Sequence, residues 1–211
     1  MNIIIFGAAG EIGSRTTSEA LSRGHTVSAV SRRAHDRRQP GVQPIRFDVD
    51  SQEDARRIIR GHDLVITALR PRDGEESKLP SLTARIVEAA IAEDVRFLVV
   101  GGAAALRMPD QPDHTVLTAP GFLPDEHLAI ATACQIQHDW CLPRLGDLGS
   151  YLCPPAMLTP GERTGAYRTG SGTLLTDSEG RSRISMEDFA VALLDEAERP
   201  EHTGERFTVA Y

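Results

Sequence analysis

Residues 2–13 read NIIIFGAAGEIG, a short apolar run followed by three glycines that stand three residues apart. An unbroken apolar run of this length is typical of a strand buried on both faces of a sheet. Residues 12–23 then have the pattern of a helix, and Gly24 suits the left-handed position that closes one. This stretch predicts a strand, a glycine turn and a helix in direct succession.

The three glycines have different tasks in such a turn. Gly7 permits the tight exit from the strand, Gly10 lets a pyrophosphate approach the backbone, and Gly13 allows close packing of helix on sheet. The start of the helix offers unpaired N–H groups and a positive dipole end to phosphates. Glycines at this GxxGxxG spacing can also serve only to form a turn. We expect the following residues to bind a dinucleotide: Gly7, Ala9, Gly10, Glu11, Ile12 and Gly13.

Strand and helix patterns alternate along the rest of the chain. Further strands are expected at residues 26–31, 42–47, 63–69, 95–100, 149–152 and 206–211. Helices are expected at residues 51–61, with Ser51 as N-cap, and at 79–93, 124–138 and 186–198, the last capped by Ser185. Residues 106–120 are expected to form a surface loop, and residues 167–168 and 174–175 a short hairpin. Alternation of this kind predicts a Rossmann-type, doubly wound parallel α/β sheet. We expect one domain over residues 1–211, whose elements from about 154 to 211 partly form the substrate side.

The end of the second predicted strand distinguishes between two dinucleotides. An acidic residue there would bind the ribose hydroxyls of NAD, whereas a cation would accept the additional phosphate of NADP. Arg32 and Arg33 occupy this position. Arg32 is the better placed to bind the 2′-phosphate and to stack on adenine. NADP(H) is therefore preferred over NAD(H), the alternative being a solvated basic loop.

Residues at the ends of other strands complete the expected cofactor site, because ligands of such sheets lie across the carboxyl ends of the strands. Asp48 and Val49 follow the third strand and could meet the adenine edge, although Asp48 could equally start a turn. The fourth and fifth strands contribute small or flexible residues that leave room for ribose and nicotinamide: Ala68, Leu69, Arg70, Gly101 and Gly102.

Composition narrows the class of partner. Charged residues make up 25% of the 211 residues, and the net charge is −7. That balance disfavours nucleic acid and anionic membranes, and no stretch approaches the ~18 apolar residues of a membrane helix. No secretion signal is apparent, so a cytoplasmic protein with a small-molecule substrate is expected. The three cysteines form no CxxC pair, which favours buried or incidental thiols over a metal site: Cys134, Cys141 and Cys153.

Several further motifs carry a family resemblance. They are IIFGAAGEIG at 4–13, RGHTV at 23–27, FDV at 47–49, VVGGA at 99–103, YLCPPAM at 151–157, PGERTG at 160–165, ISMEDFA at 184–190 and RFTVAY at 206–211. With them the chain resembles the atypical short-chain dehydrogenase/reductases of the NAD(P)H-binding, NmrA-like group. The nearest likeness is to the NADH-flavin reductase-like branch, which is similar in turn to biliverdin reductase B. The resemblance implies a nicotinamide cofactor and, in some members, flavin or quinone reduction.

The resemblance also implies contacts to the nicotinamide end from Cys153, Pro154 and Ala156, although the two prolines could simply make a rigid strand exit. One departure concerns the Tyr-xxx-Lys pair of the wider superfamily, in which lysine lowers the pKa of a proton-transferring tyrosine. His127 falls near that position with Ala131 after it, and Lys78 is the single lysine of the chain. Alcohol–ketone chemistry by the usual mechanism is therefore disfavoured.

Hydride transfer to an electron-poor planar acceptor needs less from the protein, because solvent can supply the proton. The sequence thus favours an NADPH-dependent reductase of a flavin, a quinone or a similar molecule. His127 is the candidate proton donor, and a surface histidine is the alternative. Two other functions stay open: a redox-sensing protein that binds NADP(H), and an isomerase, dehydratase or cyclase on the same fold.

Overall fold

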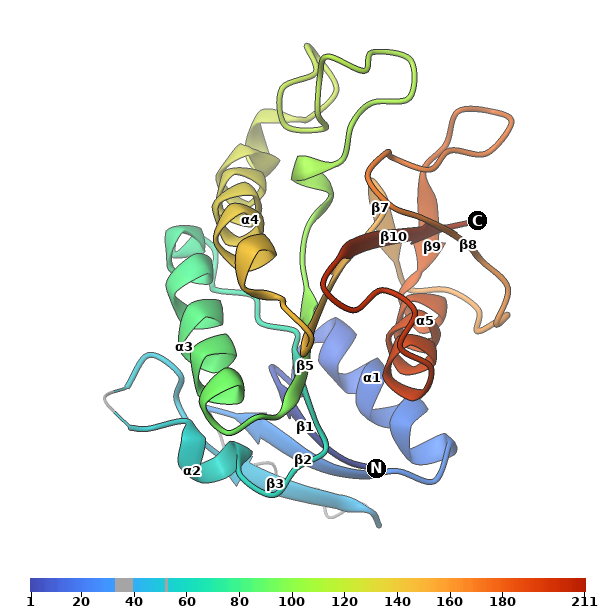
Figure 1. Ribbon diagram of the computed structural model, residues 1–211. Helices are drawn as coiled ribbons and strands as arrows, with labels where there is room; N and C mark the ends of the chain where they lie inside the picture. Colours follow the sequence, from blue (N-terminus) through green and yellow to red (C-terminus); the bar gives the residue numbers. More distant parts are fainter. Residues whose placement is uncertain (33–39, 52) are drawn as a thin grey trace.

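The computed structural model of the protein describes residues 1–32, 40–51 and 53–211. Its centre is a sheet with α3 and α4 on one face and α1 and α5 on the other (Figure 1). The strands stand in the order β3 (Val42–Arg46), β2 (Thr26–Ser31), β1 (Asn2–Phe6), β4 (Leu64–Thr67), β5 (Arg96–Val100), β6 (Gly149–Cys153), β10 (Arg206–Ala210) and β8 (Arg168–Gly170). The helices are α1 (Glu11–Ser22), α2 (Arg56–Ile59), α3 (Leu79–Ala92), α4 (Leu128–Cys141) and α5 (Met186–Glu198).

Shorter elements complete the described chain. A second, two-stranded sheet pairs β7 (Met157–Thr159) with β9 (Arg183–Ser185). Single turns of 3₁₀ helix are η1 (Glu76–Lys78), η2 (Ala103–Ala105), η3 (Asp125–His127) and η4 (Leu142–Arg144).

The topology is that of a doubly wound sheet. β1 pairs in parallel with β2 on one side and with β4 on the other, so the chain winds outward in both directions from β1. Among the described strands of this sheet, β8 alone runs antiparallel, against β10. The predicted Rossmann-type α/β fold is therefore confirmed, with a switch in winding direction between β1 and β4.

Alternation along β1 explains its two-sided burial. Ile3 and Ile5 pack in a cluster with residues of α1 and α5, whereas Ile4 and Phe6 pack in a cluster with residues of α3 and α4. Successive side chains of a strand point to opposite faces, so an unbroken apolar run satisfies both layers. The sequence pattern and the observed burial agree here for this reason.

The helix predicted at residues 51–61 is much shorter than expected. α2 spans only Arg56–Ile59, and its N-cap residue is Ala55 without a side-chain cap. The Ser51 hydroxyl instead accepts a hydrogen bond from the Glu53 N–H at 3.2 Å. The Ser51 side chain therefore stabilises a local turn and does not cap the helix, and serine readily forms such turns.

Two expectations for irregular segments also need correction. The hairpin expected about residues 167–168 and 174–175 does not form, because β8 pairs with β10 and Leu174 donates its N–H to the Arg107 carbonyl. Residues 106–120 form a loop as predicted, but Leu106 and Val116 within it are buried in the core. In both cases, contacts with distant parts of the chain determine the structure of the segment.

The start of α5 anchors the C-terminal part of the fold. Ser185 caps the helix as predicted, accepting a hydrogen bond from the Asp188 N–H at 2.9 Å. The fully buried Asp188 carboxylate accepts hydrogen bonds from the backbone and hydroxyl of Thr164, from the Gly165 N–H and from the Tyr211 hydroxyl. Burial raises the pKa of Asp188, but these donors outweigh it and hold the pKa below its usual value.

Replacement of Asp188 with Asn should lower the free energy of unfolding by about 3 kcal/mol, because several buried donors lose their carboxylate. Since the native pKa is depressed, this stabilisation is present above about pH 4 and is lost as the pH falls through the native value. Urea unfolding should therefore show a large difference between wild type and Asp188→Asn at about pH 7 and a smaller one at about pH 3. Asp54→Asn, at an exposed aspartate, is the control and should change stability little. Equal effects of the two substitutions would contradict the anchoring role.

Candidate functional site

The glycine turn connects β1 to α1 with very little space around it. Gly7 has a φ of +80°, and a Cβ on it would lie 2.4 Å from the Ala68 carbonyl oxygen at the end of β4. A Cβ on Gly13 would lie 2.1 Å from the Gly7 oxygen, whereas one on Gly10 would lie 3.2 Å from the same atom. Gly7 and Gly13 are therefore required by packing, and Gly10 is less constrained.

The start of α1 is open to a ligand. Gly10 is its N-cap and, within the described residues, no side chain caps the helix. Ala9, Gly10 and Glu11 are exposed at the tip of the turn, with Ile12 half-buried behind them. The first N–H groups of an α-helix have no partner inside the helix. The turn thus fits a pyrophosphate: a Cβ-free approach at Gly10 leads to exposed donors at the positive end of a helix dipole.

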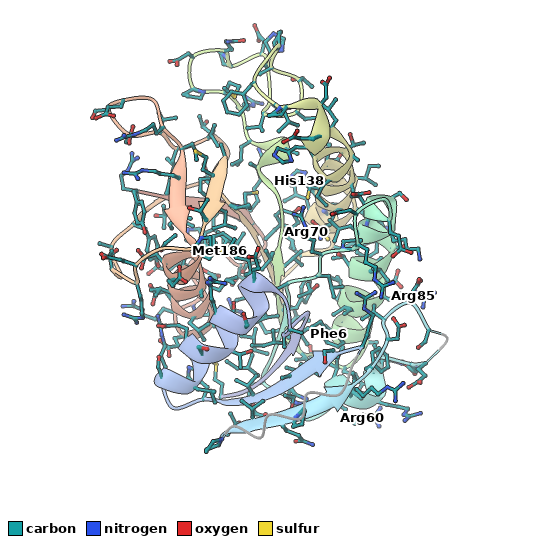
Figure 2. The ribbon with its side chains drawn as sticks, turned by 180° about the vertical axis from the view of Figure 1, so that it is seen from behind. Phe6, Arg60, Arg70, Arg85, His138 and Met186 are labelled. Carbon is teal, nitrogen blue, oxygen red and sulfur yellow. The ribbon has the colours of Figure 1, made fainter. Side chains whose placement is uncertain are left out.

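The ends of β4 and β5 lie beside this turn. β4 pairs in parallel with β5 as far as Thr67 and Val99, so the two strands end at the same edge of the sheet. Ala68 and Leu69 are half-buried and Arg70 is exposed. Figure 2 shows Arg70 above the start of α1, on the side of α4. The structure therefore brings these predicted residues together at one edge of the sheet.

Gly101 and Gly102 after β5 serve close packing. A Cβ on Gly101 would fall 2.1 Å from a ring carbon of Tyr151, and one on Gly102 would fall 2.6 Å from the Cys134 sulfur. Both glycines therefore let a neighbouring side chain pack directly beneath the strand end. Their backbone stays partly accessible.

The end of β6 adjoins the same edge, since β6 pairs with β5. Cys153 is fully buried, so its side chain belongs to the core and only its backbone can face a ligand. Pro154 is half-buried and Ala156 exposed, and the Ala156 N–H donates to the Ser182 hydroxyl at 3.2 Å.

The adenosine end is described only in part. Arg32 is exposed at the end of β2, whereas Arg33 lies outside the described residues. Asp48 accepts a hydrogen bond from the Asp50 N–H at 3.1 Å, which makes the turn that was one of its two expected roles. The buried Val49 borders a hollow of about 410 Å³ between α2 and α3.

The candidate proton donor is exposed at the start of α4. His127 ends η3, its side chain is 56% exposed, and it lies 3.9 Å from a Glu126 carboxylate oxygen. Lys78 forms ion pairs with Asp50 and Glu75, each at 3.1 Å. Neither residue is thus arranged as part of a Tyr-xxx-Lys pair, and a catalytic role of His127 stays a prediction.

Titratable groups beneath the strand ends are held neutral. Burial raises the pKa of Cys134 to about 11 and that of Cys153 to about 12. Burial also places the pKa of Tyr151 well above its usual value, and its hydroxyl donates to Gln137 at 2.9 Å. These groups therefore stay protonated beneath the strand ends and supply no nucleophile near neutral pH.

Two negative findings concern the parts of the chain that the structure describes. Within residues 1–32, 40–51 and 53–211, no helix is both long and apolar enough to cross a membrane. Over the same residues, no group of three or more His, Cys, Asp or Glu side chains could hold a metal ion.

The structure also reveals a contact between a half-buried arginine and a buried histidine that the sequence patterns did not suggest. Arg206 on β10 lies 3.1 Å from His138 on α4 and donates to the Ala105 carbonyl at 3.0 Å. These residues are far apart in the sequence and belong to no common motif. No local signal could have indicated their contact.

Comparison with known proteins agrees with this geometry. The model of a family described as NAD(P)H-binding matches residues 7–197, which include the glycine turn and all five α-helices of the described chain except the last residue of α5. The chain belongs to this NAD(P)H-binding family. The resemblance seen in the sequence motifs is thereby confirmed.

Relatives of this family member extend over its full length. The uncharacterized protein YwnB of Bacillus subtilis is 35% identical over 214 residues, which cover 99% of this chain and 98% of the relative. A solved structure from Burkholderia pseudomallei, provisionally described as an exported protein, is 36% identical, covers 100% of both chains and has a TM-score of 0.89.

Two other solved structures have provisional names that differ in chemistry. A protein from Bacteroides thetaiotaomicron, provisionally described as an epimerase, is 33% identical over 100% of this chain and 96% of its own, with a TM-score of 0.89. One from Streptococcus pneumoniae, provisionally described as an NADH-flavin reductase, is 26% identical over 100% and 99%, with a TM-score of 0.88.

The different roles of Gly10 and Gly13 can be separated by substitution. Gly10→Ala should cost about 1 kcal/mol of stability yet weaken NADPH binding at least tenfold (~1.4 kcal/mol), because the new methyl group stands in the approach to the helix start. Gly13→Ala should destabilise the fold by about 2–3 kcal/mol through overpacking against Gly7. Urea unfolding and NADPH fluorescence titration measure the two effects. Wild-type NADPH affinity in Gly10→Ala would contradict the assignment of this turn.

Proposed function

We propose that the protein is an NADPH-dependent reductase that transfers a hydride to a flavin, a quinone or a similar planar acceptor. The observation that carries this proposal is the uncapped start of α1, which opens at the switch in winding direction beside the ends of β4, β5 and β6. Ligands of open α/β sheets lie at this position.

The residues that would hold the dinucleotide divide by charge. Backbone N–H groups at the start of α1 would bind the pyrophosphate, and the exposed Arg32 would bind the 2′-phosphate of NADPH. Arg70, exposed at the end of β4, supplies a second cation at this edge. Gly101 and Gly102 with Pro154 would border the nicotinamide.

When bound, NADPH would supply the hydride, so the protein has only to place the acceptor and exclude water. Tyr151 lies against Gly101, but it is fully buried and its hydroxyl is engaged with Gln137. Burial likewise raises the pKa of the Cys134 thiol, which therefore stays protonated near neutral pH. Neither side chain is thus available as a positioned acid. A planar acceptor, which can take its proton from solvent, suits such a site better than a ketone, which needs a positioned acid.

The names of two relatives suggest two different reactions. The provisional name of the Streptococcus pneumoniae protein, NADH-flavin reductase, favours a flavin. The provisional name of the Bacteroides thetaiotaomicron protein, epimerase, favours an isomerase on the same fold. An epimerase would return its cofactor unchanged, whereas a reductase consumes NADPH in proportion to the acceptor reduced.

The organisation of the protein follows from the same proposal. We propose that residues 1–211 act as one domain, whose elements from about 154 to 211 partly form the substrate side. The three cysteines, Cys134, Cys141 and Cys153, are free thiols, which suits the reducing cytoplasm that we propose for this protein.

Stopped-flow mixing of the NADPH-bound protein with FMN or quinones should show oxidation of NADPH in a single turnover. His127→Phe should leave this rate unchanged, because the histidine side chain is 56% exposed and solvent supplies the proton. A large fall in the rate would instead identify His127 as the donor. Tight NADPH binding without oxidation by any acceptor would contradict the reductase and favour a redox-sensing role.

The choice of dinucleotide can be tested at Arg32. Arg32→Gln should raise the Kd for NADPH about 10- to 100-fold while changing the Kd for NADH less than about threefold, since only NADPH carries the 2′-phosphate. Isothermal titration measures both constants. Arg57→Gln, at an exposed arginine of α2, is the matched control and should change neither. Equal losses for both dinucleotides in Arg32→Gln would contradict this role.

A further inference from the structure

Arg206, on β10, contacts the turn that follows β5, a strand two places away in the sheet. Its guanidinium donates to the carbonyl of Ala105 at 3.0 Å. Ala105 is the last residue of η2, and the N-cap of η2 is Gly102. A single side chain on β10 therefore reaches the segment that directly follows the two glycines of the candidate site.

His138 fixes the position of this guanidinium. The Nε2 atom of His138 lies 3.1 Å from Arg206, and Nδ1 lies 2.9 Å from the Asp139 carboxylate. Since a guanidinium can only donate, Nε2 accepts and Nδ1 carries the hydrogen that Asp139 accepts. The side chain of His138, labelled in Figure 2, is only 7% exposed. Arg206 is thus held in one place by a histidine of defined tautomer.

The same group supports the strand end from beneath. The rings of His138 and Tyr151 pack edge to face, with centroids 5.4 Å apart. The Tyr151 ring occupies the space that a Cβ on Gly101 would need. His138 therefore contacts both the arginine that holds η2 and the aromatic ring that lies against Gly101.

A second segment meets Arg206 from the other side. A Cβ on Gly172 would lie 3.0 Å from the guanidinium, so the chain passes close to it there. The Gly172 carbonyl accepts from the Arg107 N–H, and the Arg107 carbonyl accepts from the Leu174 N–H, each at 2.9 Å. Arg206 thus stands where the segment after β5 and the segment after β8 come together.

We propose that Arg206, held by His138, is a positioning residue that sets the turn Ala103–Ala105 on the acceptor side of the nicotinamide. This inference rests on the proposed reductase function. Arg206 acts through the Ala105 carbonyl and not on the reacting atoms. One guanidinium nitrogen, Nη1, contacts both Ala105 and His138, while another, Nη2, lies nearest to the position of a Cβ on Gly172. A planar guanidinium fixes the directions of these nitrogens, whereas a lysine amine is a single point donor without that geometry. A misplacement of about 1 Å near reacting groups can lower a rate 100-fold.

The test compares three variants of the full-length protein with wild type. Arg206→Met should lower kcat/KM for FMN or a quinone about 10- to 100-fold, with the Kd for NADPH changed less than about twofold. Arg206→Lys should recover part of the loss. Arg168→Met is the matched control, because Arg168 also donates to two backbone carbonyls, those of Thr176 and Tyr211, but on β8. It should leave kcat/KM near the wild-type value.

A spectroscopic measurement separates positioning from general stability. Nitrogen-15 NMR of His138 should show the Nδ1–H tautomer in wild type and Arg168→Met, and a changed tautomer balance in Arg206→Met. Backbone amide signals of Ala103–Ala105 should shift on NADPH binding in wild type and should respond differently in Arg206→Met. If Arg206→Met does not fold, the same signals are read in Arg206→Lys.

Several results would overturn the inference. One is an equal loss of kcat/KM in Arg206→Met and Arg168→Met. Another is a loss of NADPH affinity as large as the loss of rate, or an Nε2–H tautomer of His138 in wild type. If wild type reduces no acceptor, the reductase proposal fails, and the positioning role is then decided by the Ala103–Ala105 signals. Identical signals in wild type and Arg206→Met would reject it.

Discussion

The close approach of α1 to the turn after β1 is the constraint on which the rest of the site depends. A side chain on Gly13 would overlap the Gly7 carbonyl, and one on Gly7 would overlap the carbonyl of Ala68. Only a chain without Cβ atoms at these two places lets the helix begin directly over the switch between β1 and β4. The uncapped helix start and the adjacent strand ends then follow from the geometry of the sheet.

The position of α1 is secured from its other side by α5 and the segment that precedes it. Glu19 of α1 is buried and forms ion pairs with Arg23 and Arg163. A hydrogen bond from Arg163 is the main cause that holds the pKa of Glu19 below its usual value. Glu187 of α5 pairs with Arg15 at 2.6 Å and accepts from the Gly161 N–H. The segment that contains Gly161 and Arg163 is therefore tied to α1.

The two halves of the site are built by different means. The proposed dinucleotide half is formed mainly by backbone groups, at the glycine turn, the helix start and the strand ends. A close-packed βα unit of this type provides these groups. The proposed acceptor half uses side chains that are buried, as in Tyr151 and His138, or half-buried, as in Cys134 and Arg206. Burial raises the pKa of the thiol and of the phenol, so in the proposed site both would contact a ligand in their protonated forms. The chemistry of the proposed reductase then resides in its cofactor.

Local sequence determined the elements whose residues interact with near neighbours. The strand expected at 26–31 has those bounds as β2, the apolar run of β1 is buried on both faces, and Ser185 caps α5 three residues before its donor. The family and the glycine turn could likewise be predicted, because their signals lie within short stretches. The gathering of Ala68, Gly101 and Pro154 near that turn followed from the rule that parallel strands end at one edge.

Only the tertiary structure decided the remainder. The pairing of β8 with β10 replaced a plausible local hairpin, and a turn at Ser51 left α2 with only Arg56–Ile59. Arg206 and His138 are 68 positions apart and meet only because α4 packs on a face of the sheet to which β10 belongs. Periodicity and turn chemistry act over a few residues, whereas such contacts depend on how distant crossovers pack. For that physical reason the glycine turn and the strand ends beside it could be predicted from the sequence, and the contact between Arg206 and His138 could not.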